Sequence, residues 1–226
     1  DHLYLHSFPT RRSSDLLAAL EAAIEGIGQS PGEAAVYVGE SISALRRLSR
    51  NVDNLLEMTR LETGGLRPRH DWCDIPALVD AALDLTRDAL EGHPVREGLA
   101  PSLPMVRLDE TLLVGALVQI LHNVGRHTPP GTEACLRAQV TGGVLEIDIV
   151  DRGPGFGDID PERLFEKFFH GGGRSCGMGL GLTIARGLVR AQGGELTAMR
   201  RPEGGAIFRV RLPVDTRCLE DDGRGI

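Results

Sequence analysis

Apolar residues at helical spacing dominate the first quarter of the chain. Residues 17–27, LAALEAAIEGI, favour a helix with its apolar positions on one face. The turn sequence Gly-Gln-Ser-Pro-Gly at 28–32 separates it from a longer helix predicted over 33–63. Because each helix has one apolar face, we predict a helical hairpin over 17–66 that pairs with a second copy as a four-helix bundle. Packing of the hairpin on the rest of its own chain is the alternative. The stripe of the longer helix consists of Ile42, Leu45, Leu48, Val52, Leu55 and Leu56.

Helical and strand patterns alternate in the remainder of the chain. Asp109 is placed to cap a helix, and Thr141-Gly142-Gly143 is placed to turn a hairpin. We therefore predict an α+β fold: the hairpin, then an α/β sandwich over 67–214 with a mixed sheet and helices on one face. The predicted helices cover 75–90, 110–127 and 180–192, and the predicted strands cover 95–99, 105–108, 133–140, 144–150, 195–200 and 206–212.

Both ends of the chain lack a periodic pattern. Residues 1–16 mix two histidines, a proline and a basic-serine run, and we interpret them as a poorly ordered or foreign leader. Residues 215–226 are mostly polar and are interpreted as a flexible tail.

Composition excludes several classes of function. The net charge of -7 gives no support to a nucleic-acid surface. No apolar run approaches the roughly 18 residues of a membrane span, and no signal peptide is evident. The 4 cysteines are far apart and form no CxxC pair, which favours free thiols in a reducing compartment. We expect a cytoplasmic location for this chain, no membrane segment of its own and no nucleic-acid partner.

Two glycine-rich clusters mark the candidate site. The strand pattern of 144–150 ends in Asp151-Arg-Gly-Pro-Gly155, where glycines let backbone approach a ligand closely. Further along, Gly177-Met-Gly-Leu-Gly181 opens a helix, and the free N–H groups and dipole of a helix N-terminus suit phosphate. A carboxylate to bind the adenine base, glycines that allow close approach and a helix N-terminus for the phosphates together predict an ATP pocket.

Four motifs in sequence order resemble those of the catalytic end of bacterial sensor histidine kinases, which carry a GHKL-type ATP-binding domain. The resemblance covers residues 17–213 and includes Arg201-Pro-Glu-Gly-Gly-Ala206, which is similar to the Kdp-type potassium-sensing kinases. It implies transfer of the γ-phosphate of ATP to a bundle histidine and then to the receiver domain of a response regulator. It also implies that this chain is the cytoplasmic catalytic portion of a membrane-anchored protein. The motifs are an N box at 119–127, DxGxG at 151–155, an F box at 164–169 and GxGxG at 177–181.

The resemblance implies a role for each matched residue. Asp151 would accept a hydrogen bond from the adenine amino group, and Asn123 would hold Mg²⁺ through an oxygen. Gln119 stands where the kinases usually have asparagine and gyrase-type ATPases a water-activating glutamate. Glutamine cannot act as a general base, so hydrolysis is disfavoured, and Gln119 is only a weak Mg²⁺ candidate. The other ATP-binding candidates are Arg126, His127, Gly153, Gly155, Phe165, Phe168, Gly177, Gly179, Leu180, Gly181 and Thr183.

Some of these candidates have a second interpretation. His127 would stack on adenine or interact with the helix dipole. Phe165 and Phe168 would anchor a lid or belong to the core. Thr183 would cap the helix or contact phosphate, or be an ordinary helix residue.

The acceptor histidine of the family has no counterpart in this sequence. When the leucine of the acceptor motif is aligned with Leu17, the histidine position falls on Arg11, which cannot accept phosphate. Nucleotide binding is therefore expected without autophosphorylation. Two other functions stay open: a nucleotide-binding dimerisation module without catalysis, and an ATPase of the gyrase, heat-shock-chaperone and mismatch-repair superfamily.

Overall fold

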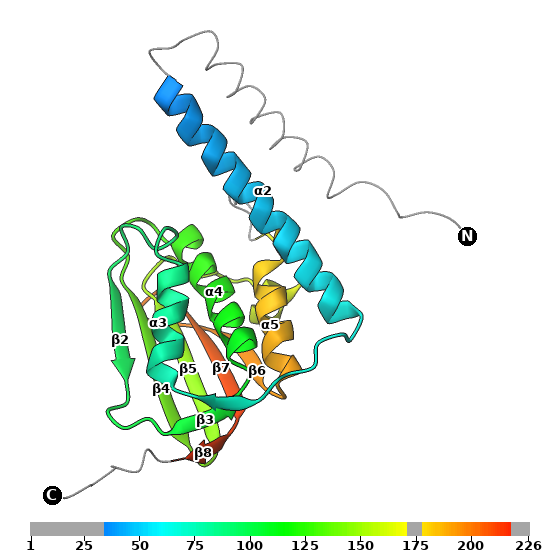
Figure 1. Cartoon of the computed structure of the whole chain (residues 1–226). Helices are drawn as coiled ribbons and strands as arrows, with labels where there is room; N and C mark the ends of the chain where they lie inside the picture. The colour runs from blue at the N-terminus through cyan, green and yellow to red at the C-terminus, as the bar shows by residue number, and fades with distance from the viewer. Residues whose placement is uncertain (1–33, 171–177, 218–226) are drawn as a thin grey trace, which may run out of the picture. The chain divides into compact units, whose positions relative to one another are not determined.

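The computed structural model describes residues 34–170 and 178–217 (Figure 1). The predicted helix over 17–27, the leader with Arg11, and Gly177 lie outside these residues. The chain divides into two compact units, and the boundary in the sequence falls between Thr59 and Arg60.

The first unit contains most of helix α2 (Ala34–Glu62), as the apolar pattern over 33–63 predicted. Its stripe is exposed to solvent except for the half-buried Leu48, and Leu45 and Leu56 each keep 55% of their surface accessible. After the helix, Gly64 adopts a positive φ of 63°, the left-handed conformation that glycine tolerates at a helix end. Among the described residues, no helix combines the length and the apolar character that crossing a membrane requires.

The second unit is built on a five-stranded mixed sheet with helices on one face (Figure 1). The strand order is β2-β4-β5-β7-β6, in which β2 runs parallel to β4 and every other pair is antiparallel. The prediction of a mixed sheet covered on one face is confirmed. The strands are β2 (Val95–Leu99), β4 (Ala134–Thr141), β5 (Val144–Asp151), β6 (Glu195–Arg200) and β7 (Ala206–Pro213), and the helices are α3 (Ile75–Leu85), α4 (Glu110–His127) and α5 (Gly181–Ala191).

A second, three-stranded antiparallel sheet has the order β1-β3-β8. It contains β1 (Asp71–Cys73), β3 (Met105–Leu108) and β8 (Asp215–Arg217). The assignment of residues 215–217 to a flexible tail was therefore wrong. All three side chains of β8 are exposed, so no alternation marks the strand, and backbone pairing with β3 holds it.

Helix α3 ends earlier than the predicted residue 90. Its C-cap is Thr86, whose hydroxyl donates to the carbonyl of Ala82 at 2.7 Å. A threonine that bonds back to the preceding turn competes with continuation of the helix. The other predicted helices and strands that fall within the described residues agree with the structure to within one residue at either end.

The core of the second unit lies between the helices and the sheet. Helix α4 begins at Asp109, whose carboxylate accepts from the backbone N–H of Leu112 at 3.0 Å, as the cap prediction required. The opposite face of the sheet is polar, and Arg209 there binds both carboxylate oxygens of Asp148 at 2.7 Å. The buried stripe of α4 consists of Leu112, Leu113, Ala116, Leu117, Ile120, Leu121 and Val124.

Candidate functional site

Asp151 is a buried acid at the end of strand β5. Its side chain is 4% exposed, and its Oδ1 accepts from the backbone N–H of Gly153 at 2.9 Å. Burial raises the pKa of this carboxyl, whereas hydrogen bonds from the backbone of Gly153 and Ala206 and the charge of Arg201 oppose the rise. The strand end therefore presents a carboxylate whose direction is fixed by its own backbone surroundings.

The glycines after Asp151 are required by contacts within the protein. A Cβ at Gly153 would lie 2.6 Å from Cγ2 of Thr128, the C-cap of α4. Gly155 has a φ of 67°, and a Cβ there would lie 2.8 Å from the carbonyl oxygen of Gly205. These distances are too short for a side chain, so the loop is packed between the end of α4 and the turn that follows β6.

The polar face of α4 carries the N-box residues. Gln119 and Asn123 are half-buried and lie one turn apart on the same side of the helix. A Cβ at Gly181 would lie 3.0 Å from Oε1 of Gln119, which places the Gln119 amide at the start of α5. The structure therefore brings the N box and the start of α5 together.

The last two N-box candidates lie at the end of α4. Arg126 and His127 are exposed in its last turn. Although part of its surface is accessible, neighbouring protein atoms shield the imidazole of His127 from water, and this desolvation is the first cause that lowers its pKa; the positive charges of Arg126 and His170 lower it further. The lowered pKa favours the uncharged imidazole of His127.

The N-terminus of α5 has backbone donors and no capping side chain. Its N-cap is Leu180, which is buried and forms no side-chain cap bond. Gly179 has a φ of 68°, and a Cβ there would lie 2.6 Å from the carbonyl oxygen of Phe169. The N–H of Phe168 donates to the carbonyl of Gly179 at 2.9 Å. The F box thus ends directly against the start of α5.

The F box begins in the last two residues of the 3-10 helix η2 (Pro161–Phe165), which contacts α5. The hydroxyl of Thr183 donates to the carbonyl of Phe165 at 2.9 Å. The guanidinium of Arg186 lies 4.7 Å from the centre of the Phe165 ring and forms an ion pair with Glu162 at 2.7 Å. Phe165 is buried in the core, whereas Phe168 is 49% exposed with a φ of 61°.

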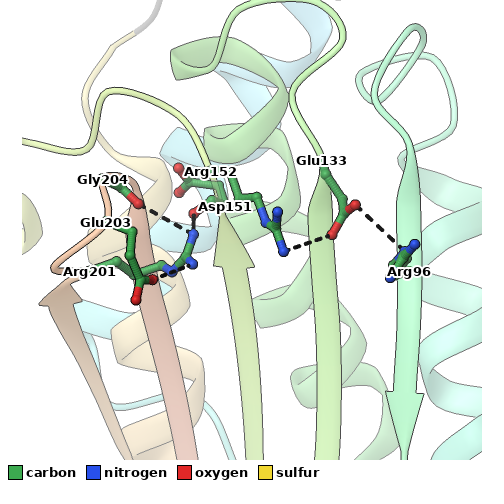
Figure 2. A network of polar contacts seen from close by, with 7 residues as sticks. All are labelled: Arg96, Glu133, Asp151, Arg152, Arg201, Glu203 and Gly204. Atoms are coloured by element: carbon green, nitrogen blue, oxygen red, sulfur yellow. Dashed lines mark hydrogen bonds and ion pairs between the residues drawn. The ribbon is translucent and has the colours of Figure 1, made fainter.

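Three residues at the site were missed by the sequence analysis. Thr128 packs against Gly153, Arg186 holds η2, and Arg201 donates to the carbonyl of Asp151 at 3.2 Å (Figure 2). Their partners are distant in the sequence, and a local motif carries no signal for such contacts. Among the described residues, no group of three or more His, Cys, Asp or Glu side chains gathers around a common point to bind a metal.

Residues 108–216 match the family described as histidine kinase-, DNA gyrase B-, and HSP90-like ATPases. This stretch contains the N box, Asp151, η2 and α5, so the candidate site lies within the matched residues.

Sensor histidine kinases are among the curated proteins that this chain resembles. The sensor protein KdpD of Escherichia coli is 36% identical over 170 residues, which are 74% of this chain and 19% of KdpD. The sensor protein SphS of Synechococcus elongatus is 35% identical over 199 residues, 80% of this chain and 47% of SphS. The chain is therefore similar to the catalytic region of these kinases, the Kdp-type sensors among them, and it spans from about a fifth to about half of their length.

Solved structures show the same fold. The histidine kinase AdeS of Acinetobacter baumannii has a TM-score of 0.70 at 21% identity, covering 88% of this chain and 95% of AdeS. The mycobacterial sensor histidine kinase MprB has a TM-score of 0.58 at 26% identity, covering 66% of this chain and all of the MprB chain.

Proposed function

We propose that this chain is the nucleotide-binding catalytic region of a sensor histidine kinase and that it binds ATP together with Mg²⁺. The observation that carries the proposal is the Asp151 carboxylate, 4% exposed and oriented by the N–H of Gly153, within a domain of the ATPase family. A fixed acceptor of this kind suits the amino group of adenine, because no reorganisation is needed when the base arrives.

The opposite end of the site suits the phosphates. The N-terminus of α5 offers backbone N–H groups without a side-chain cap, an arrangement that favours anions. Asn123, with Gln119 as the weaker candidate, would supply amide oxygen to Mg²⁺, and phosphates and water would complete its ligands. Bound Mg²⁺ would neutralise charge on the phosphate oxygens. The guanidinium of Arg126 would pair with phosphate, and the neutral imidazole of His127 would stack on adenine.

The reaction that fits these groups is phosphoryl transfer to a protein acceptor. Gln119 has no basic group to activate water, so nothing at this position favours hydrolysis. A histidine on the bundle would attack the γ-phosphate in line, and the site would act by positioning and charge neutralisation. The phosphoryl group would then pass to an aspartate of a response regulator receiver domain. Arg11, at the aligned acceptor position, lies outside the described residues.

The test is incubation with γ-labelled ATP and Mg²⁺, using the chain as it stands and a version with His-Asp-Leu-Arg-Thr-Pro placed before Leu17. Label retained only by the second version supports kinase chemistry with the acceptor supplied. Release of phosphate without labelled protein would replace this proposal with an ATPase.

A nucleotide-binding dimerisation module without catalysis is the second candidate, and Arg11 at the acceptor position is the observation that favours it. This candidate predicts ATP affinity with no label on either version of the chain. The incubation above therefore distinguishes the two functions.

We further propose that α2 pairs with the same helix of a second copy. Six large apolar side chains in the described part of α2 are exposed. Except for the adjacent Leu55 and Leu56, successive members lie three, four or seven positions apart, and leaving such a stripe in water is costly. The six are Val38, Ile42, Leu45, Val52, Leu55 and Leu56.

Sedimentation velocity tests this pairing. The unchanged chain is expected to sediment as a dimer, and Leu45→Gln with Leu55→Gln as a monomer that keeps its ATP affinity. Arg50→Gln, on the exposed polar surface of the same helix, is the matched control and should leave the dimer intact. A monomeric unchanged chain would remove the pairing and leave the nucleotide site unaffected.

A further inference from the structure

The turn between β6 and β7 packs against the end of β5. Its last two glycines, Gly204 and Gly205, have φ values of 91° and 94°. A Cβ at Gly205 would lie 2.1 Å from the carbonyl oxygen of Asp151, so backbone meets backbone at this point. Figure 2 shows this turn beside the strand that ends in Asp151. Only glycine permits such an approach.

Arg201 begins this turn and connects it to Asp151. Its guanidinium donates through Nη1 to the carbonyls of Asp151 at 3.2 Å and Gly204 at 3.3 Å. Through Nη2 it donates to Glu203 at 3.0 Å. The side chain of Arg201 is 16% exposed, whereas that of Glu203 is 77% exposed. The guanidinium therefore lies mostly within the protein and faces the strand end.

The contact between Arg201 and Asp151 lies just beyond the last residue pair of the β5–β7 ladder. The β5–β7 ladder extends to the pair Val150 and Ile207, one residue before Asp151. Beyond it, the guanidinium of Arg201 donates to the backbone carbonyl of Asp151, and the backbone of Ala206 acts on the carboxylate and lowers its pKa. Both polar groups of Asp151 are consequently held by this turn and the strand that follows it.

We propose that Arg201 is a positioning residue for adenine recognition: it holds the backbone of Asp151 so that the carboxylate points at the base. This inference rests on the proposed binding of ATP. Arg201 does not contact the nucleotide in this role. It acts through Asp151, and its positive charge also favours the ionised carboxylate, which is the form that accepts the hydrogen bond.

The other charged groups of this region are paired away from the carboxylate. Arg152 forms an ion pair with Glu133 at 3.6 Å, and Glu133 also pairs with Arg96 at 3.5 Å (Figure 2). Helix α4 meets the loop after Asp151 through Thr128, which does not titrate. Among these groups, Arg201 is the one whose charge lowers the pKa of Asp151.

The experiment is calorimetric titration with ATP and Mg²⁺ across a range of pH for the unchanged chain, Arg201→Gln and Arg201→Lys. Arg96→Gln is the matched control, because Arg96 lies in the same region and has no bond to Asp151. Thermal unfolding of each variant shows whether it is folded. Protonation of the ATP phosphates over this pH range affects every variant equally, so it cancels when the affinities of the variants are compared.

Arg201→Gln is expected to weaken ATP binding about ten-fold at neutral pH, since one charged hydrogen bond is lost. It should also move the acid-side loss of affinity to higher pH, because the charge that lowers the pKa of Asp151 is gone. Arg201→Lys keeps the charge and loses the planar fork. It should weaken binding less and leave the acid-side midpoint in place. Arg96→Gln should bind within two-fold of the unchanged chain.

Two results would overturn the inference while leaving the proposed function standing. One is ATP affinity within two-fold of the unchanged chain for a folded Arg201→Gln. The other is an equal loss of ATP affinity in Arg201→Gln and Arg201→Lys, with no shift of the pH midpoint at which affinity is lost on the acid side. A purely structural contact of the turn would produce that result. Absence of ATP binding by the unchanged chain would remove the proposed function itself.

Discussion

The two ends of the candidate site use glycine for different reasons. At the Asp151 end, Gly153, Gly155 and Gly205 each face another part of the chain at a distance that excludes a Cβ. At the α5 end, the backbone of Phe169 likewise excludes a Cβ at Gly179. Gly181, the first residue of the helix, instead has the flexible amide of Gln119 as its nearest neighbour at 3.0 Å, and the N-cap residue Leu180 makes no side-chain cap bond. The first end is fixed by the fold, and the second leaves room at the backbone for a ligand.

We therefore expect substitutions at the two ends of the site to have different consequences. A side chain added at the Asp151 end disturbs the protein before any ligand arrives, so it should cost stability. A side chain added at the start of α5 disturbs the surface offered to phosphate, so it should cost affinity.

The largest effect is expected from Gly205→Ala. The φ of 94° and the 2.1 Å separation between the added Cβ and the carbonyl oxygen of Asp151 force the turn away from β5. We expect a loss of about 3 kcal/mol or more in the free energy of unfolding, measured in urea. Gly142→Ala is the control, because its φ is 59° and no atom lies within 4 Å of its Cβ position. An equal loss in the two variants would show that the contact with Asp151 is unimportant.

The second-largest effect is expected from Asp151→Asn, which should weaken ATP binding. Asparagine can still accept the N–H of Gly153, so the loop is retained while the charged acceptor is lost. We expect ATP affinity to fall by about 2 kcal/mol, roughly thirty-fold, with little change in the unfolding midpoint. Unchanged affinity in calorimetry would mean that Asp151 does not contact the base.

Gly153→Ala tests the contact between the loop and the end of α4. Its Cβ would lie 2.6 Å from Cγ2 of Thr128, and we expect a loss of about 1.5 kcal/mol in stability. Thr128→Ser removes that methyl group and keeps a hydroxyl that can donate to Val124. The double variant should therefore recover about 1 kcal/mol, a coupling that a double-mutant cycle measures. Additive losses would contradict the packing explanation.

The smallest effect on stability is expected from Gly181→Ala. The amide of Gln119 can move aside, and alanine is a better helix former than glycine. The free energy of unfolding should change by less than about 0.5 kcal/mol, while ATP affinity falls several-fold. A large loss of stability here would remove the distinction between the two ends.

The sequence predicted most elements of the second unit because their apolar patterns are strong. Helix α4 and strands β5 and β7 have buried positions at regular spacing, and their limits agree with the prediction to within one residue. Strand β8 has no apolar alternation, because only its backbone is used. The end of α3 was predicted too late, because the Thr86 hydroxyl is a weak signal in a strongly helical pattern.

The sequence motifs select residue types for the candidate site, and the structure adds how they are arranged. The motifs include Asp151, Asn123 and the glycines, whereas Arg201 has its partner fifty positions earlier in the chain. The difference between Phe165 in the core and Phe168 at the surface also depends on tertiary packing, since both are aromatic residues of one motif. Such assignments need the three-dimensional contacts.

The central claim is that the carboxylate of Asp151 recognises the amino group of adenine, and it is tested most directly by comparing ATP with GTP. Guanine has a carbonyl oxygen where adenine has the amino group, and this oxygen would face the carboxylate without a shared proton. Calorimetric titration of the unchanged chain with each nucleotide and Mg²⁺ should show one ATP per chain and GTP affinity at least ten-fold lower. Equal affinities, or no uptake of ATP by folded protein, would contradict the account.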